Sequence, residues 1–232
     1  MLTWKKAFSS TVGRKFLMGL SGLLLVGFIF AHLAGNLTLL VPGGEAFNLY
    51  AKKLSDLGPL LYVMEVGLIF VFLLHIVSGV RLKIENKGAR TQGYRSTRSK
   101  GGPSKSNVAS INMIVTGVII LVFLVVHIWQ FKFGPGMDDG YIALVDGKKG
   151  RDLYRLVAET FSNPLWAGFY VFIMSLLGMH LRHGFWSAFQ SLGLAYPRYS
   201  KPIYLLAMLI AAATALGFII LPLYLYVMHA GV

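Results

Sequence analysis

The sequence predicts an all-α integral membrane protein with five transmembrane helices. Its composition is 56% hydrophobic and only 13% charged, whereas soluble domains average about 25% charged residues. The charged residues are also segregated, and the apolar runs between them reach the roughly 20 residues that a helix needs to cross a bilayer. Because no long polar segment interrupts this pattern, we expect a single membrane domain over residues 1–232.

Five apolar runs are predicted to span the membrane, over residues 16–40, 60–80, 108–133, 164–186 and 203–228. The first run is longer than the apolar core of a signal peptide, so we expect it to remain as a span. Between the third and fourth runs, apolar residues recur at helical spacing and predict a short surface helix over residues 151–161. No repeat of fixed period is found along the chain.

The basic residues predict the orientation in the membrane. Lys and Arg number four in residues 1–15, eight in residues 81–105 and three in the last connection counted with Arg182. The loops 41–59 and 132–163 carry equal numbers of bases and acids. The positive-inside rule therefore places the N-terminus in the cytoplasm. On this interpretation the net charge of +13 reflects topology and does not indicate nucleic-acid binding.

Four of the spans each contain a histidine, and the depths of these histidines match in pairs. At 1.5 Å per residue, His32 lies about 12 Å and His127 about 9 Å from the outer ends of their spans. His75 and His180 each lie about 9 Å from the cytoplasmic end. Since ionisable residues at such depths are costly and usually functional, we expect two layers, His32 with His127 and His75 with His180.

Two imidazoles that meet inside a helix bundle are the ligand set of a six-coordinate haem b. Both axial positions of the iron are then filled, which suits electron transfer. An interhelical hydrogen bond is the alternative, and a zinc site is disfavoured because no cysteine or carboxylate joins either layer. The absence of cysteine also excludes disulfides, Cys-ligated clusters and covalent c-type haem in this chain.

Small residues near these histidines would let a flat macrocycle approach the backbone, or would serve helix–helix packing. They are Gly19, Gly22 and Gly35 in the first span, Ser78 and Gly79 in the second, and Gly117 and Gly178 in the third and fourth.

Further candidates lie near the span ends. His183 is about 4.5 Å from the end of its span, where it suits a haem propionate or a quinone head. Glu65 is the only acid inside a span and would serve proton uptake, a quinone on the outer side, or helix packing. Ser21 and Gln190 are candidate hydrogen-bond partners for a quinone, and His229 is expected at the membrane interface.

Three arginines lie at the cytoplasmic ends of the spans, namely Arg14, Arg81 and Arg182. They would pair with haem propionates, or they would serve only as positive-inside topology signals. The two interpretations are equally supported by the sequence.

Two motifs resemble a known family. The first is Lys15-Phe-Leu-Met-Gly-Leu-Ser-Gly-Leu, followed by His32-Leu-Ala-Gly-Asn-Leu. The second is His180-Leu-Arg-His183-Gly-Phe-Trp-Ser-Ala-Phe-Gln-Ser-Leu-Gly. Together they resemble the cytochrome b membrane anchor of succinate dehydrogenases and fumarate reductases, in its five-helix, di-haem form. The resemblance covers nearly the whole chain.

This resemblance implies a di-haem four-helix core with a fifth helix beside it. His32 and His127 would ligate the distal haem b, and His75 and His180 the proximal one. The family's distal quinone-site acid has two candidates here, Glu65 and Glu45.

The resemblance also implies partners. A flavoprotein and an iron–sulfur subunit would dock on the cytoplasmic face of a bacterial inner membrane, and electrons would pass between them and a quinone, usually menaquinone. The chain would be the electron-transfer subunit of an enzyme complex, which could itself dimerise. Because the sequence has no dinucleotide fingerprint, the dicarboxylate chemistry would lie on the partner chains. The loop 81–105 would be their docking surface, or only a solvated topology loop.

Two alternatives remain open. One is a di-haem cytochrome b anchor of another quinone-linked dehydrogenase, such as a hydrogenase or formate dehydrogenase. The other is a haem-free anchor or transporter.

Overall fold

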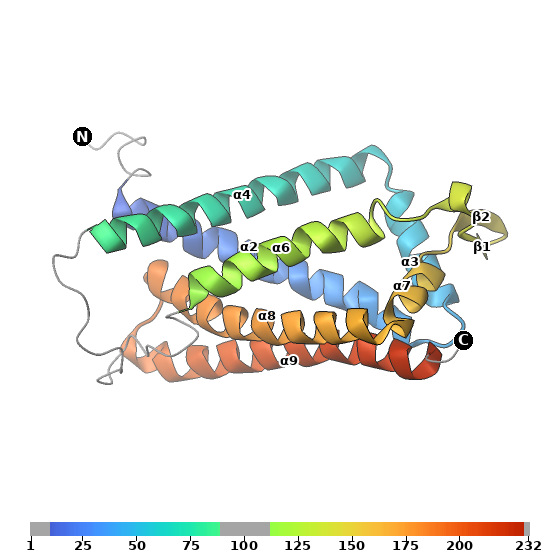
Figure 1. The fold of residues 1–232 in the computed structure, drawn as a ribbon. Coiled ribbons are helices and arrows are strands. Elements are labelled where there is room, and N and C mark those ends of the chain that lie inside the picture. The colour runs from blue at the N-terminus through green and yellow to red at the C-terminus, as the bar shows by residue number, and fades with distance from the viewer. Residues whose placement is uncertain (1–9, 89–111, 230–232) are drawn as a thin grey trace. The chain divides into compact units, whose positions relative to one another are not determined.

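The computed structural model describes residues 10–88 and 112–229, and the predicted all-α membrane fold is confirmed. Five of the helices described there are long and apolar enough to cross a membrane. They are α2 (Thr11–Asn36), α4 (Pro59–Gly88), α6 (Met113–Phe131), α8 (Pro164–Ser191) and α9 (Pro197–His229) (Figure 1). Large apolar side chains such as Phe70 and Val125 are about two-thirds exposed on these helices, at 65% and 64%. Such a surface suits lipid and does not suit water.

The helices run past several of the predicted span ends. The helix α4 continues to Gly88, and α9 already begins at Pro197. Hydropathy marks where a helix enters the apolar layer, whereas backbone chemistry marks where the helix begins and ends. Proline is the first residue of α4, α8 and α9, a position where its fixed φ and missing N–H cost nothing. Residues 1–9 and 89–111, including most of the basic loop, lie outside the described residues.

Short elements occupy the connections between the long helices. The 3₁₀ turn η1 (Leu37–Leu40) and α3 (Glu45–Ser55) precede α4. The turn η2 (Met137–Asp139), the strands β1 (Ile142–Val145) and β2 (Lys148–Arg151), and α7 (Leu153–Ser162) precede α8. The short surface helix expected over residues 151–161 corresponds to α7.

The hairpin of β1 and β2 was not predicted, although its signal is present in the sequence. Asp146 and Gly147 form its two-residue turn, with φ of 50° and 69°. An Asp-Gly pair with positive φ at both positions is typical of the type I′ turn that joins antiparallel strands. The strands pair antiparallel, with Val145 opposite Lys148.

The residues group into two compact units. Unit 1 comprises Met1–Phe28, Val66–Gly117 and Met179–Ala211, and unit 2 comprises Ile29–Glu65, Val118–Gly178 and Ala212–Val232. Each unit contains parts of all five long helices. The assignment of the whole chain to a single domain stays a prediction.

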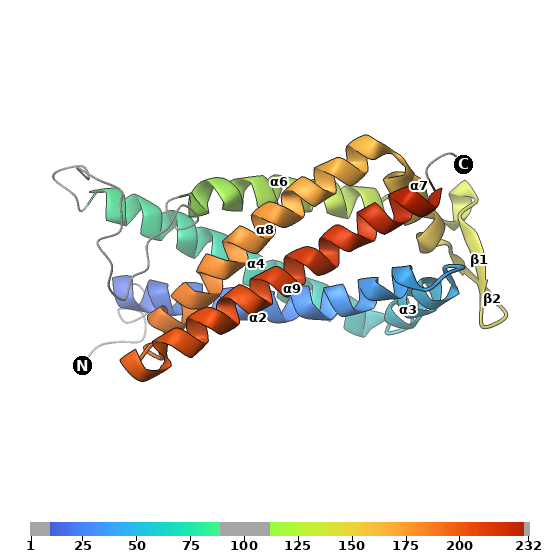
Figure 2. The same cartoon turned by 90° about the horizontal axis from the view of Figure 1, so that it is seen from below.

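In unit 2, α3 packs against α7 and the hairpin (Figures 1 and 2). The buried amide of Asn48 joins these elements, since its Nδ2 donates to Asp152 at 2.8 Å and its Oδ1 accepts from the backbone N–H of Tyr154 at 2.9 Å. Asp152 in turn caps α7 by accepting from the N–H of Arg155. Apolar residues complete this core, among them Leu39, Phe47, Val157, Phe161 and Tyr170.

Arg151 ties the hairpin to the C-terminal end of α6. Its guanidinium donates to the carbonyl oxygens of Phe131, Gly134 and Pro135 at 2.9, 3.0 and 2.9 Å. The last carbonyls of a helix have no partner within the helix, and a cation is the favourable charge there. Arg151 therefore fixes the end of the helix that contains His127.

We predict that Arg151→Gln destabilises the protein by about 2 kcal/mol, because hydrogen bonds from a charged donor contribute roughly 1.5–3 kcal/mol. Thermal unfolding in detergent micelles measures this effect. The control is Arg155→Gln. Arg155 is exposed and pairs with Glu159, whose pKa is lowered by hydrogen bonds from Tyr141 and Arg155. An equal loss in both variants would contradict the role given to Arg151.

Candidate functional site

In unit 1, a buried hydroxyl on α2 contacts the imidazole of His75 on α4. Ser21 Oγ lies 3.4 Å from His75 Nδ1 and 2.7 Å from the carbonyl oxygen of Leu17. A hydroxyl has one hydrogen to donate, and here that hydrogen goes to the Leu17 carbonyl. Ser21 can therefore only accept from the imidazole, so Nδ1 carries the proton.

His180 on α8 has an equivalent partner on α6. Thr116 Oγ1 lies 3.1 Å from His180 Nδ1, and the hydroxyl donates to the carbonyl oxygen of Asn112 or Met113 at 3.2 or 3.1 Å. A Thr116 hydroxyl that donates to one of these carbonyls would accept from His180, as argued for Ser21 and His75. In both histidines Nε2 then keeps its lone pair, which is the form of imidazole that binds a metal.

Each of these hydroxyl residues is followed by a glycine that contacts the same imidazole. A Cβ added at Gly22 would lie 3.3 Å from Cε1 of His75, and one added at Gly117 would lie 3.5 Å from Cε1 of His180. The Cβ at Gly22 would be a tight contact, whereas the Cβ at Gly117 would be in ordinary van der Waals contact with the ring. His75 and His180 both belong to unit 1. Unit 1 therefore brings two oriented imidazoles together, here called the His75–His180 site.

In unit 2, His32 on α2 and His127 on α6 form a second pair, the His32–His127 site. Their ring centroids are 5.8 Å apart and the ring planes are nearly perpendicular, at 89°. A metal ion about 2 Å from each of two opposed imidazole nitrogens sets the ring centres roughly 6 Å apart. The observed separation is close to that value.

A tyrosine orients His127. Tyr170 on α8 is buried, and its hydroxyl lies 3.4 Å from Nδ1 of His127. That hydroxyl donates to Oε1 of Gln130 at 2.6 Å, so it too can only accept from the imidazole. Phe123 stacks on the His127 ring, with the two ring centroids 5.5 Å apart and the planes at 29°.

The residues of both sites fit haem b. The three hydroxyl residues are almost completely buried, with Ser21 exposed by 1% and Thr116 and Tyr170 by 6%, whereas all four imidazoles retain accessible surface. In His75, His127 and His180, the nitrogen Nδ1 thus contacts a hydroxyl of a neighbouring helix. This donor set, two neutral imidazoles per site, is that of a bis-histidine haem.

Two of the other candidate residues in unit 1 are engaged by side chains of the chain itself. Arg14 forms an ion pair with Glu85 at 2.8 Å, and Arg182 donates to the hydroxyl of Tyr204 at 2.6 Å. Arg81 is exposed and His183 is half-buried. Whether any of these four contacts a propionate stays a prediction.

The structure also places the remaining candidates. Glu65 forms an ion pair with Lys132, Glu45 is exposed at the start of α3, and Ser21 faces His75 from a fully buried position. His229 bonds the carbonyl of Leu225 and lies edge-on to Tyr154.

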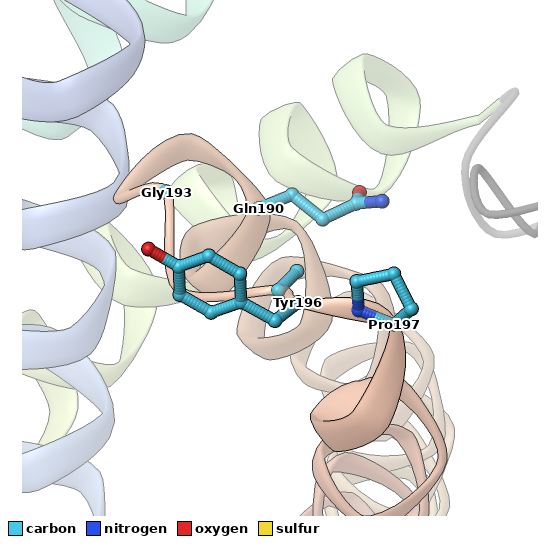
Figure 3. A pocket seen from close by; sticks show the side chains of 5 residues that line it. Gln190, Gly193, Tyr196 and Pro197 are labelled. Carbon is cyan, nitrogen blue, oxygen red and sulfur yellow. The ribbon is translucent and has the colours of Figure 1, made fainter.

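Two hollows open near the helix ends, one in each unit. The hollow in unit 1 measures about 340 Å³ and is lined by Gln190, Gly193, Ala195, Tyr196 and Pro197 (Figure 3). The hollow in unit 2 measures about 440 Å³, and its lining includes Gln130, Asp139 and Thr160. The lining of the hollow in unit 2 includes Gln130, which is hydrogen-bonded to Tyr170, the partner of His127.

Three residues of the sites were missed from the sequence, namely Thr116, Tyr170 and Gln130. Thr116 and Tyr170 are ordinary residues of apolar helices until the facing helix is known. A signal was nevertheless available, because Thr116 precedes His127 by the same eleven residues that separate Ser21 from His32.

The chain is similar to known membrane subunits. A family model described as the succinate dehydrogenase/fumarate reductase transmembrane subunit matches residues 7–102. The succinate dehydrogenase cytochrome b558 subunit of Bacillus subtilis is 30% identical over 173 residues, which cover 74% of this chain and 75% of that protein. The succinate dehydrogenase hydrophobic membrane anchor subunit of Halobacterium salinarum is 30% identical over 101 residues, 44% of this chain and 68% of that protein. No solved structure gives a significant match.

For a haem bound at the His75–His180 site, we predict that Thr116→Val removes or alters it and spares the other site. Valine keeps the volume but leaves the Nδ1–H of His180 without an acceptor, at a cost of about 1–3 kcal/mol, and Thr116→Ser should preserve the acceptor. Haem content and the low-spin electron paramagnetic resonance signal measure the outcome. The control is Thr214→Val, because Thr214 is fully buried in α9 and its hydroxyl has no hydrogen-bond partner among the described residues. If the serine and valine variants behaved alike, the role of the hydroxyl would be refuted.

Proposed function

The chain belongs to the succinate dehydrogenase/fumarate reductase transmembrane subunit family, and from this premise we propose that it is the di-haem cytochrome b anchor of a succinate:quinone oxidoreductase. In this role it passes electrons between an iron–sulfur subunit and a membrane quinone. The observation that supports the proposal best is that Nδ1 of three histidines contacts a buried hydroxyl, which itself donates to another oxygen.

On this proposal, His75 and His180 hold one haem b, and His32 and His127 hold the other. Bound haem supplies a one-electron carrier at each site. The chain's own contribution would be to orient the imidazoles and to supply two of them at each site. Ser21, Thr116 and Tyr170 perform the orientation, and Gly22 and Gly117 leave room for the rings.

The partners follow from the same role. A flavoprotein and an iron–sulfur subunit provide the dicarboxylate chemistry at the cytoplasmic face of a bacterial inner membrane, and the N-terminus of this chain lies on that side. The distribution of Lys and Arg supports this orientation. Co-purification separates the proposal from its alternative, since an anchor of a hydrogenase or formate dehydrogenase would bring down different subunits.

We place the quinone in the hollow of unit 2. Its lining offers the amide of Gln130 and the hydroxyl of Thr160 beside the apolar rings of Trp129 and Phe133, which suits an apolar ring with carbonyl oxygens. Gln130 also bonds Tyr170, the partner of His127. A quinone bonded to Gln130 would thus be connected to His127 through three hydrogen bonds, by way of Gln130 and Tyr170.

Replacement of single histidines tests the haem assignment. We expect His75→Ala and His127→Ala each to remove one of two haems, because each leaves one site with a single imidazole. A dithionite-reduced minus oxidised spectrum of the purified complex, with quantified haem, measures this. A wild-type complex without a b-type α band would refute the haem function, and loss of both haems or of neither in the two variants would refute the pairing.

The two hollows provide a matched pair for the quinone site, because each is lined by one glutamine. We expect Gln130→Leu to raise the KM for a soluble quinone by at least tenfold, the effect of losing one hydrogen bond of about 1.4 kcal/mol. Gln190→Leu should leave this KM within twofold of the wild-type value. A raised KM in Gln190→Leu with an unchanged KM in Gln130→Leu would instead place the quinone site in the hollow of unit 1.

A further inference from the structure

The helices α2 and α6 contain the same set of residues at one spacing. A hydroxyl residue and a glycine, Ser21-Gly22 in α2 and Thr116-Gly117 in α6, are each followed by a histidine ten residues after the glycine. Two more identities fall at the same offset of 95 residues, Met18 with Met113 and Phe28 with Phe123. The contacts agree as well, because each hydroxyl residue and each glycine contacts the histidine of the long helix that follows.

The helices α4 and α8 match in the same way. Each begins with Pro-Leu, reaches its histidine sixteen residues after the proline, and has a glycine four residues later. In α4 these residues are Pro59, Leu60, His75 and Gly79, and in α8 they are Pro164, Leu165, His180 and Gly184.

A short helix lies between the long helices in both halves, α3 in the first and α7 in the second. The segments α2–α3–α4 and α6–α7–α8 are therefore two copies of one unit. The offset is 95 residues in the first helix and 105 in the third because the second copy has a longer connection, which contains the hairpin. Because the offset changes from 95 to 105 residues, the repeat has no fixed period along the chain.

The repeat assigns a counterpart to every residue around the histidines. Tyr170, ten residues before His180, faces Nδ1 of His127. The equivalent position in the first copy, ten residues before His75, is Glu65. We propose that Glu65 is the hydrogen-bond acceptor for Nδ1 of His32, as Tyr170 is for His127. The inference rests on the proposed haem function and adds a positioning residue to it.

The chemistry of Glu65 suits this role. It is half-buried within α4, and Lys132, which directly follows α6, pairs with one of its carboxylate oxygens. An ionised carboxylate can only accept hydrogen bonds, with about four acceptor positions in total, so an ion pair through one oxygen leaves positions for a further donor. Glu65, His32 and Lys132 all belong to unit 2.

A carboxylate partner acts more strongly than a hydroxyl. A carboxylate bonded to a ligating imidazole raises the basicity of the ligand, which stabilises the oxidised metal. The haem at the His32–His127 site should therefore have a lower reduction potential with Glu65 than with a neutral residue in its place.

The test is a redox titration of Glu65→Gln in the intact complex, with the haem lost in His127→Ala identifying the relevant wave. We expect the reduction equilibrium of that haem to shift about tenfold towards the reduced form, or about 59 mV for one electron. Glu65→Asp should recover part of the shift. The control is Glu85→Gln, because Glu85 is the other glutamate of α4 and pairs with Arg14; it should leave this wave unchanged.

Three results would overturn the inference. One is an unchanged potential in Glu65→Gln with both haems bound, and another is a shift confined to the His75–His180 haem. The third is a raised quinone KM at an unchanged potential, which would make Glu65 a quinone ligand. Absence of haem from the wild-type complex would instead refute the proposed function, so the two failures are distinguishable.

Discussion

The arrangement of the histidines depends on one interaction, a hydrogen bond from imidazole Nδ1 to a hydroxyl whose own hydrogen is already donated elsewhere. Ser21 and Thr116 donate to backbone carbonyls, and Tyr170 donates to Gln130. A free hydroxyl could face either tautomer, whereas these can face only one. The proton is thereby placed on Nδ1 without any charged group beside the ring, and a neutral imidazole avoids the cost of burying a charge in hydrocarbon.

The membrane is the reason why these hydroxyls and imidazoles need hydrogen-bond partners. Water is absent from the bilayer core, so a polar group there needs a partner within the protein. Serine and threonine meet this need in helices because the hydroxyl can bond the carbonyl three or four residues earlier in the same helix. In Ser21 and Thr116 this hydrogen bond to the backbone of the same helix also sets the direction in which the oxygen faces the histidine. The adjacent Gly22 and Gly117 let the ring approach closely enough to use it.

The spans and the histidine pairs could be predicted because they depend on composition and depth along the chain. The hydroxyl partners of the histidines could not, because they depend on which helices face each other. Apolar runs marked five spans, and matched depths grouped His32 with His127 and His75 with His180, which are the pairs that units 2 and 1 contain. Thr116 and Tyr170 are hard to single out on their own, since a threonine or tyrosine in an apolar helix usually only packs. Other signals were present in the sequence but were not used, such as the Asp146-Gly147 turn and the prolines that begin α4, α8 and α9.

The internal repeat explains how the two histidine pairs can have different surroundings. The hydroxyl and glycine at Ser21-Gly22 recur at Thr116-Gly117, so the contacts made to His75 and His180 are alike in the two copies. Divergence then acts on the remaining positions, where Tyr170 stands opposite Glu65 in the alignment of the copies. A tyrosine and a carboxylate both accept from Nδ1, but only the carboxylate adds a charge to the ligand. Lys132, the counterion of Glu65, lies beyond the end of α6, so a single acid–base pair is enough to make the two copies unequal.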